Sequence, residues 1–303
     1  MNKTAKIRKL LNGLVLLAMV LIFCACGAKE EAADRGTEEW TIRQFGTAEG
    51  SQESFWTVED SEGNIVIIDG GFGSWEGSIR KYLEKFDNHV SAWIITHAHP
   101  DHVDAFNTIM ANPGDIVVDD IYTIEVNDER YRETVKDYDD VEVYDAFLDI
   151  IGDLDNVHYL KEDDELDLLG LRMKVLHAWD EDTDALSKNL MNNGSMMFTL
   201  TGNEDCILFC ADVENETEQF VIERHKDELA EVDYLQAGHH GNWGMTTDFY
   251  DHVNPVEVYF DAPNWLIEAE DKNYNAYELA DYFEGRGIEV KSFKTAPNKL
   301  VLN

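Results

Sequence analysis

Three histidines and one aspartate lie within six consecutive positions of this 303-residue chain, directly after the apolar run Ala92–Ile95. They are His97, His99, Asp101 and His102. Imidazole nitrogens and carboxylate oxygens are the ligands that zinc and similar divalent ions prefer in proteins. Four such groups so close together in the sequence can contribute ligands to two ions. The sequence therefore predicts a metal site at the end of an apolar strand.

Further candidate ligands stand near the ends of two other apolar runs. Asp212 follows the run Cys206–Cys210, and His239 and His240 follow the run Val232–Leu235 within a glycine-flanked segment. Strand ends are where a rigid sheet can direct side chains from distant segments into one crevice. We therefore expect Asp212 and one histidine of the pair to join the site. Adjacent residues point in opposite directions, so both histidines stay open as alternatives, with His239 slightly preferred.

Asp69 also ends an apolar run, Ile65–Ile68, and it is followed by two glycines. We expect its carboxylate to accept a hydrogen bond from a ligand histidine or from the motif loop, and so to orient the ligands. An equal alternative is that Asp69 caps its own glycine turn.

The elements that must position these groups are short apolar runs alternating with helical patterns. Apolar spacing predicts helices over 79–86, 144–151 and 279–283, the first with Ser74 as its N-cap. Such alternation indicates sheet layers covered by helices, in an α/β or α+β fold. Strands are predicted at Ile65–Ile68, Ala92–Ile95, Ile116–Val118, Arg172–Leu176, Met196–Leu200, Cys206–Cys210, Val232–Leu235, Val256–Phe260, Val290–Phe293 and Lys299–Leu302.

Taken together, the motifs resemble those of the metallo-β-lactamase superfamily of hydrolases over residues 40–303. Their order is most similar to that in the soluble hydrolase domain of ComEC-type DNA-uptake proteins. The resemblance implies a single domain folded as a four-layer αββα sandwich. It also implies two divalent ions, zinc in the first instance, with manganese or iron as alternatives. The motifs are Ile68–Gly71, Thr96–His102, Leu176–His177, Asn192–Ser195, Ala211–Asp212 and Gly238–Gly241.

The resemblance also implies roles for the candidate ligands. His97 and His99 would bind the first ion, and Asp101 and His102 would bind the second together with the distal histidine. Asp212 would bridge the two ions and fix their separation. Two ions so held can activate a shared water and stabilise developing negative charge. Asp101, His102 and Asp212 are therefore the expected catalytic residues.

One position departs from the superfamily pattern. The first ion usually gains a third histidine from the strand that precedes the bridging aspartate, but Ser195 and Met196 occupy that region. His177 is one candidate for the missing nitrogen, and the side-chain oxygens of Asn192, Asn193 or Ser195 are others. The alternative for His177 is a buried histidine that is hydrogen-bonded at a strand end.

The first 25 residues combine a basic start with a short apolar run, which predicts an export signal rather than a membrane span. Cys26 stands between small residues as in bacterial lipoproteins, so we expect it to carry the lipid that anchors an extracytoplasmic protein. Residues 26–39 resemble a flexible tether. A plain secretory signal or an uncleaved anchor is the alternative.

The charge of the chain restricts its partners. Net charge is −38, and it becomes −42 once the four basic residues of the signal are removed. Such an acidic protein repels nucleic acid at long range, which makes a nuclease a weaker hypothesis. We expect an enzyme, a metal-dependent hydrolase of phosphodiesters or related esters, acting on a small-molecule or cell-envelope substrate. The alternatives are a lactonase or β-lactamase, and a surface binding or scaffold module that keeps its metal without turnover.

Four tryptophans fall in segments that the resemblance places near the rim of the site. They are Trp75, Trp179, Trp243 and Trp265. Packing is the simplest role for each of them. An exposed aromatic wall within an acidic surface would, in addition, suit a cationic head group through cation–π contact.

Overall fold

The computed structural model describes residues 39–136, 139–270 and 273–303. The predictions for the export signal, for the lipidated Cys26 and for all but the last residue of the tether fall outside these residues. The described residues belong to one compact unit. None of the helices in these ranges combines the length and the apolar character that crossing a bilayer requires.

The first sheet contains seven strands. Its β3 to β6 strands run parallel, whereas β14, β1, β2 and β3 pair antiparallel. In spatial order the strands are β14 (Asn298–Leu302), β1 (Trp40–Gln44), β2 (Phe55–Glu59), β3 (Ile65–Asp69), β4 (His89–Ile94), β5 (Val117–Ile124) and β6 (Val157–Leu160).

The second sheet also contains seven strands. Neighbours are parallel from β10 to β13 and antiparallel from β7 to β10. In spatial order they are β13 (Glu289–Phe293), β12 (Glu257–Pro263), β11 (Tyr234–Gln236), β10 (Cys206–Phe209), β9 (Met197–Thr201), β8 (Leu171–His177) and β7 (Glu165–Leu168).

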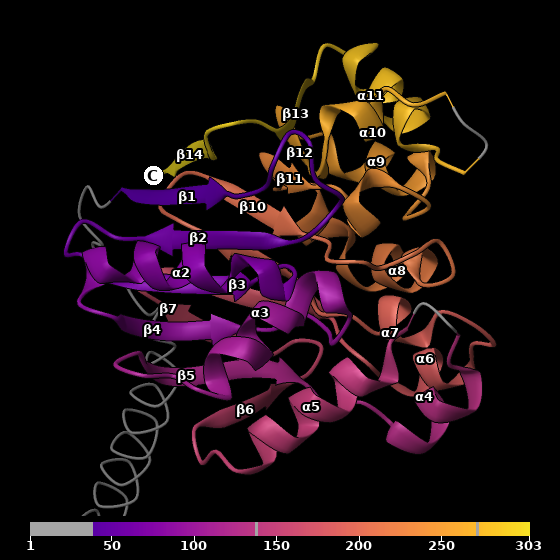
Figure 1. Ribbon diagram of the computed structural model, residues 1–303. Helices are drawn as coiled ribbons and strands as arrows, with labels where there is room; N and C mark the ends of the chain where they lie inside the picture. The colour runs from indigo at the N-terminus through magenta and orange to yellow at the C-terminus, as the bar shows by residue number, and fades with distance from the viewer. Residues whose placement is uncertain (1–38, 137–138, 271–272) are drawn as a thin grey trace, which may run out of the picture. The chain divides into compact units, whose positions relative to one another are not determined.

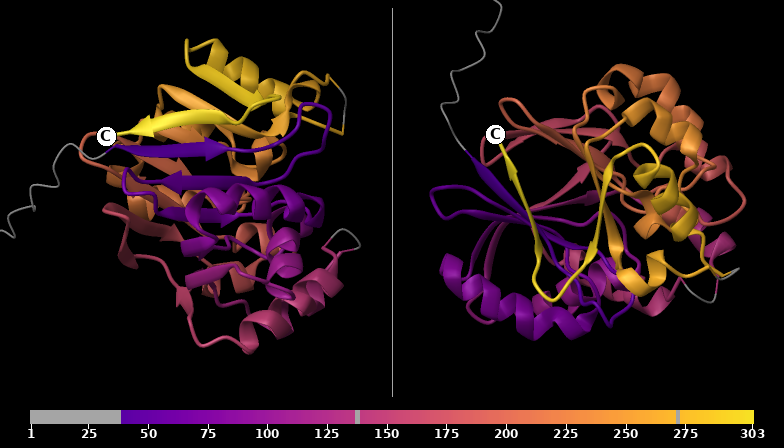
Figure 2. Two further views of the ribbon diagram at one scale, coloured as in Figure 1. Left: turned by 60° about the vertical axis from the view of Figure 1, so that its left-hand side comes forward. Right: turned by 90° about the horizontal axis from the view of Figure 1, so that it is seen from above.

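Helices cover the outer face of each sheet (Figures 1 and 2). The α-helices are α2 (Glu76–Leu83), α3 (Pro100–Met110), α4 (Asp128–Thr134), α5 (Val141–Gly152), α6 (Glu181–Ala185), α7 (Leu190–Asn193), α8 (Glu218–Leu229), α9 (Thr247–Val253), α10 (Asn264–Ile267) and α11 (Ala276–Glu284). The short 3-10 helices are η1 (Gly73–Trp75), η2 (Glu84–Phe86) and η3 (Gly238–Gly241). Residues of α2, α3 and α5 share a core with the first sheet, and residues of α8, α9 and α11 share one with the second.

The apolar strands explain the layering. Consecutive residues of a strand point to opposite faces of its sheet. In β3, Val66 and Ile68 face the core between the sheets, whereas Ile65 and Ile67 face the core beneath the helices. A strand with both faces buried needs apolar residues at every position. The predicted four-layer αββα sandwich is confirmed.

Four strands, β1, β2, β6 and β7, were not predicted from the sequence. The strand β6 lies at a sheet edge with its two central residues exposed, and β7 at the other sheet's edge is half acidic, so neither forms an apolar run. Ser74 is not the N-cap of α2, because it lies inside η1 and Trp75 takes the capping position. The chain continues from η1 into α2 with helical backbone angles, which leaves no extended residue for a cap.

The parallel strands bring the predicted motifs to one edge of the sandwich. In the first sheet, β3 ends at Asp69 and the parallel strand β4 ends shortly before His97. In the second sheet, β10 ends before Asp212, and its parallel neighbour β11 leads into η3. Because parallel strands place their carboxyl ends at the same edge, motifs that are distant in the sequence meet there.

Candidate metal centre

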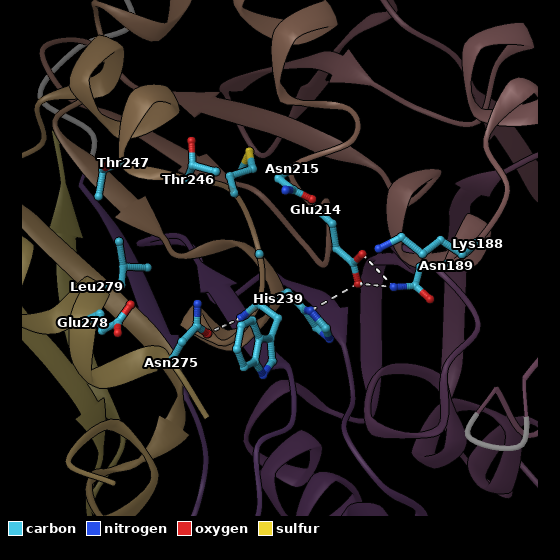
Figure 3. A pocket seen from close by; sticks show the side chains of 13 residues that line it. Lys188, Asn189, Glu214, Asn215, His239, Thr246, Thr247, Asn275, Glu278 and Leu279 are labelled. Carbon is cyan, nitrogen blue, oxygen red and sulfur yellow. Dashed lines mark hydrogen bonds and ion pairs between the residues drawn. The ribbon is translucent and has the colours of Figure 1, made fainter. Parts of the chain in front are cut away.

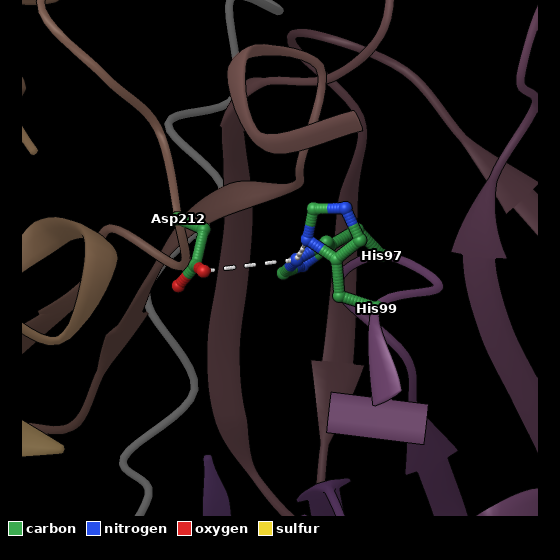
Figure 4. A group of neighbouring side chains, drawn as sticks. All are labelled: His97, His99 and Asp212. Carbon is green, nitrogen blue, oxygen red and sulfur yellow. Dashed lines mark hydrogen bonds and ion pairs between the residues drawn. The ribbon is translucent and has the colours of Figure 1, made fainter. Parts of the chain in front are cut away.

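The first group of ligand atoms comes from both sheets. The ligand atoms of His97, His99 and Asp212 all lie within 4.8 Å of one another. His97 Nε2 is 3.1 Å from His99 Nδ1 and 3.8 Å from Asp212 Oδ2. Figure 4 shows the Asp212 carboxylate facing the two imidazoles across this gap. The three side chains are buried, so they form a preformed set of two nitrogens and one carboxylate.

The second group consists of Asp101, His102 and His240, again with ligand atoms within 4.8 Å of one another. His240 Nε2 lies 3.2 Å from Asp101 Oδ2 and 3.4 Å from His102 Nε2. Asp212 also reaches this group, because its Oδ1 is 3.2 Å from His102 Nε2 and its Oδ2 is 3.3 Å from His240 Nε2. The Asp212 carboxylate therefore lies between the two groups, in a bridging position.

Helix α3 sets the direction of the second group. It begins at Pro100 with His99 as the extended N-cap residue, so Asp101 and His102 lie in its first turn. Proline suits this position because it has no N–H and its φ angle is already helical. The two histidines of the first group thus precede the helix, and the other two ligands of the motif belong to it.

Asp69 fixes the ring of His102. His102 Nδ1 is 2.8 Å from Asp69 Oδ2, and Asp69 also accepts from the backbone N–H of Thr96 at 2.9 Å. A carboxylate only accepts, so Nδ1 donates to Asp69, and Nε2 is the nitrogen that faces Asp212 and that an ion can take once its proton is lost. Asp69 thereby positions both the ligand and the loop.

Two more ligand histidines are oriented in the same way. His99 Nε2 donates to Asp139 Oδ1 at 3.0 Å, which leaves Nδ1 for a metal. His240 Nδ1 donates to the backbone carbonyl of Asp261 at 3.2 Å, which leaves Nε2. The hydrogen bond to each of these acceptors occupies one ring nitrogen, so the other nitrogen is the one available to an ion.

Electrostatics inside the site follow from burial and close opposite charges. Burial alone would lower the pKa of His240, but the Asp212 and Asp101 carboxylates raise it to about 10. The pKa of His102 is raised well above its usual value because Asp212 and Asp69 outweigh burial. Conversely, His240 and His102 hold the pKa of Asp212 well below its usual value against the effect of burial. Burial and the neighbouring His102 lower the pKa of His97.

The donor set fits two divalent ions. It contains imidazole and carboxylate groups without cysteine, and one ionised carboxylate lies between two clusters of ligand atoms. Closed structural zinc sites usually contain cysteine, whereas sites built from histidine and aspartate can keep a position open for substrate. The residues present therefore fit a pair of divalent ions.

His239 and His240 take different places. The side chain of His240 is fully buried within the second group, whereas that of His239 is 19% exposed. His239 Nε2 is 3.8 Å from Asp212 Oδ2, and its Nδ1 is 3.4 Å from Glu214 Oε1. Their left-handed backbone angles, φ 50° and 58°, turn the two rings of η3 apart. The slight preference for His239 as the distal ligand is therefore not supported, since the geometry favours His240.

The structure does not bring His177 into either group. Its Nε2 donates to the Asn193 carbonyl at 2.7 Å, and its ligand atom clusters with Glu162 and Asp180. This is the alternative role, a buried histidine hydrogen-bonded at the end of β8. Of the other residues considered for the missing nitrogen, Ser195 accepts from the backbone N–H of Asp212 at 3.1 Å and so holds that segment in place.

Three residues around the site were missed by the sequence analysis. They are Asp139, Glu214 and Asp261, all of them buried. Asp139 is 40 positions from the histidine that it orients, and it lies in a run of acidic residues that looks like solvated surface. Only Glu214 carried a usable signal, since it follows Asp212 by two positions.

Two cavities open at the metal centre. A cavity of about 320 Å³ lies over it and is lined by His99, Asp101, Asp212 and His239, among others. A larger one of about 770 Å³ adjoins it, and the two share Asn189, Glu214 and His239. In Figure 3, Asn275, Glu278 and Leu279 lie on one side of the larger cavity and Glu214, Asn189 and Lys188 on the other.

The four tryptophans differ in their surroundings. Trp75 and Trp179 are partly buried in the helix-side core, and each donates its indole N–H to a carboxylate, Glu53 at 2.6 Å and Asp184 at 2.8 Å respectively. Trp243 and Trp265 are 52% and 46% exposed. Only Trp243 is among the residues that line the larger cavity. The four therefore do not form one aromatic wall.

Comparisons with known proteins support the fold. Residues 49–175 match the model of the metallo-beta-lactamase superfamily. The structure is similar to the metallo-beta-lactamase fold protein YhfI from Bacillus subtilis, with 12% sequence identity and a TM-score of 0.51 over 87% of this chain and 98% of that one. Curated proteins give no match.

A second similar structure is CmlA, a diiron β-hydroxylase from Streptomyces venezuelae. Identity is 15% and the TM-score is 0.54, over 88% of this chain and 55% of CmlA, so the present chain spans about half of that protein. Similarity at these identities shows the fold alone. The chain thus has the αββα fold, residues 49–175 match the superfamily model, and its His/Asp clusters are candidate metal ligands.

Proposed function

We propose that the protein is a dinuclear metal-dependent hydrolase that cleaves phosphodiesters or related esters. The observation that carries the proposal is the Asp212 carboxylate, whose Oδ1 is 3.2 Å from His102 Nε2 and whose Oδ2 is 3.8 Å from His97 Nε2. One carboxylate therefore serves both ligand groups. The ComEC-like order of motifs supports a phosphodiester substrate, and the acidic chain supports a small phosphodiester or envelope polymer over nucleic acid.

The chain's own residues have distinct tasks in this proposal. His97, His99 and Asp212 would hold one ion, and Asp101, His102, His240 and Asp212 the other. Such a pair, when bound, supplies an activated water and stabilises the negative charge that develops on the substrate. Asp212 sets the spacing of the pair. His239 faces the cavity beside the ligands, where it contacts substrate rather than completing the distal set.

The metal is proposed to be zinc, which the nitrogen and oxygen donors suit, with iron or manganese as alternatives. The diiron centre named for CmlA, which shares the fold, supports iron as an alternative. The exclusively His/Asp composition of both groups is compatible with each of these metals. Elemental analysis of the purified protein distinguishes them.

The test is the double variant Asp101→Ala/His102→Ala. It removes two ligands of the second group, and we expect loss of phosphodiester turnover with the fold retained. A matched control is His89→Ala/Asp119→Ala, which removes a histidine–aspartate pair at 2.8 Å on the surface, where the side chains are 47% and 49% exposed. Undiminished turnover in the first variant contradicts the two-metal mechanism.

A scaffold module that keeps metal without turnover is the second candidate from a different class. A panel of chromogenic phosphodiesters, phosphomonoesters, lactones and carboxylic esters separates the two. Metal at two equivalents with no turnover across the panel would favour the scaffold. Turnover restricted to lactones would favour a lactonase.

We also propose an extracytoplasmic location with a lipid anchor at Cys26. The basic and apolar start of the chain and the small residues around Cys26 support it. In a bacterial host, the wild-type protein should fractionate with membranes, and Cys26→Ser should release it or block its processing. Equal membrane association of both proteins would contradict the anchor.

A further inference from the structure

The larger cavity lies beside the metal centre and has its own distinct lining. Its volume is about 770 Å³, against about 320 Å³ for the cavity over the ligands. Because the two share Asn189, Glu214 and His239, a substrate whose ester group lies at the metals can extend into the larger one. The chemistry of its lining therefore indicates what the substrate carries beyond its ester.

Trp243 is held in an exposed position by the surrounding backbone. Its side chain is 52% exposed although it is a large apolar group. Its backbone N–H donates to Asn275 Oδ1 at 2.6 Å, and its indole N–H donates to the Asn273 carbonyl at 3.1 Å. Its φ of 63° lies in the left-handed region, which is strained for a bulky residue and persists only where the surroundings impose it. The structure thus presents a rigid indole to the cavity.

The charged side chains of the lining have hydrogen-bond or ion-pair partners. Glu214 accepts from Asn189 Nδ2 at 2.8 Å and from Asn192 Nδ2 at 3.0 Å, and His239 lies next to it. Lys188 pairs with Glu216 at 2.6 Å. Glu278 is the remaining carboxylate, and it accepts from the Tyr277 hydroxyl at 3.0 Å. Because Glu214 and Glu278 are carboxylates and Lys188 is paired, such a lining does not attract a polyanion.

The rest of the lining is rich in uncharged hydrogen-bonding side chains. Amides and hydroxyls act as both donors and acceptors, as the hydroxyl groups of a sugar or polyol do. A cationic ligand is usually enclosed by several faces of Trp, Tyr or Phe, but among the described residues that line this cavity Trp243 is the one residue of these three types. The uncharged polar residues are Asn189, Asn215, Thr246, Thr247 and Asn275.

We propose that the larger cavity is a subsite for a sugar or polyol group attached to the scissile phosphodiester. The indole of Trp243 packs against the apolar face of the ring, and Asn275, Asn215 and Glu278 bind its hydroxyl groups. This inference rests on the proposed hydrolase function. It replaces the cationic head group that the tryptophans suggested from the sequence.

The experiment compares three phosphodiesters that share the p-nitrophenyl leaving group and differ only in the retained alcohol, which is glucose linked through its 6-hydroxyl, choline or methanol. We expect the metal-loaded full-length protein to cleave the glucose diester with kcat/KM at least about tenfold above the methyl diester, chiefly through KM. The choline diester should show no such preference.

Two tryptophan variants show whether Trp243 causes the preference. Trp243→Ala should reduce the glucose-to-methyl ratio of kcat/KM towards one, and Trp243→Phe should restore part of it. Trp265→Ala is the matched control, because Trp265 is 46% exposed and also donates its indole N–H to a backbone carbonyl, that of Gly50 at 3.1 Å, but lies outside the lining of this cavity. It should keep the wild-type ratio.

The outcomes separate this inference from the function on which it rests. Turnover of all three diesters at equal kcat/KM, or a preference for choline, overturns the sugar subsite and leaves the hydrolase standing. A glucose preference that survives in Trp243→Ala also overturns it. No turnover of any diester by the metal-loaded protein refutes the proposed function and the subsite together.

Discussion

Each ligand histidine whose ring is oriented by an outer acceptor presents one defined nitrogen to the metal centre. For His102 the acceptor is the Asp69 carboxylate at 2.8 Å, and for His99 it is the Asp139 carboxylate at 3.0 Å. A carboxylate acceptor also makes the opposite ring nitrogen a stronger donor to a metal. Affinity for the ions therefore depends on residues that do not touch them.

The role of Asp139 leads to a prediction at this scale. Asp139→Ala removes the acceptor of His99, and we expect metal affinity to fall about 10- to 100-fold with the fold intact. Competition with a chelating dye measures the affinity. The control is Asp120→Ala, which removes a carboxylate paired with an exposed histidine, His158, at 2.7 Å. Equal affinity of the Asp139 variant and the wild type would show that Asp139 does not orient a ligand.

Protons compete with metal at the same nitrogens. The pKa of His240 is raised from 6.5 to about 10 in the metal-free protein, and that of His102 is also raised, so both rings are protonated near neutral pH. Each must lose its proton to bind an ion. The apparent affinity for metal should therefore rise with pH until His240 loses its proton at about 10, and metal binding near neutral pH should release protons.

Calorimetry in buffers with different ionisation enthalpies measures that release. The raised pKa of His240 also makes the stability of the metal-free protein depend on pH. Because the folded pKa of His240 is raised, its protonated form stabilises the metal-free fold fully below about 6.5, and that contribution is lost as pH rises through about 10. Metal binding without proton release would contradict the assignment of these two histidines as ligands.

At the scale of elements, the backbone of η3 must pass close to β12 for His240 to reach the site. Gly241, the residue after His240, has a φ of 80°, and a Cβ there would lie 2.1 Å from Phe260 Cδ1. Phe260 belongs to β12 and is fully buried, so it has no room to move aside. Only glycine fits both the backbone angle and the contact with β12.

Gly241→Ala should therefore lower the free energy of unfolding by at least about 3 kcal/mol, the sum of left-handed strain and overpacking. Gly63→Ala is the control for the first effect, because Gly63 has φ 89° and no atom within 4 Å of the added Cβ. We expect it to cost about 1 kcal/mol. Chemical denaturation measures both, and similar values for the two variants would exclude the contact with Phe260 as the cause.

The elements that could be predicted from the sequence are those with a strong local signal. Strands such as β3 and β10 are buried on both faces and appear as continuous apolar runs, and all ten predicted strands exist. Edge strands such as β6 keep polar residues exposed, so their apolar signal is weak. Helix α3 was missed because its first turn is the metal motif itself, which the sequence analysis interpreted only as ligands.

The candidate site shows the same division. The motif of residues 97–102 and Asp212 could be predicted because their residue types are rare in combination. The choice between His239 and His240 depends on backbone angles in η3 that alternation in a strand does not describe. The place of Asp139 depends on tertiary contact across 40 positions, which no local pattern carries.

At the scale of the whole molecule, the αββα sandwich joins two sheets that both contribute ligands to the candidate metal centre. His97, His99, Asp101 and His102 follow β4 of the first sheet, and Asp212 and His240 follow β10 and β11 of the second. The core between the sheets, with Ile68 from one and Phe209 from the other, holds these halves in register. The proposed function therefore requires that ligands from both sheets bind shared metals.

A crystal structure of the metal-loaded protein, with anomalous scattering measured at the absorption edge of the bound metal, tests that requirement most directly. We expect two anomalous peaks about 3.5 to 4 Å apart on either side of the Asp212 carboxylate, one beside His97 and His99 and the other beside Asp101, His102 and His240. A single peak, or peaks remote from Asp212, would contradict it.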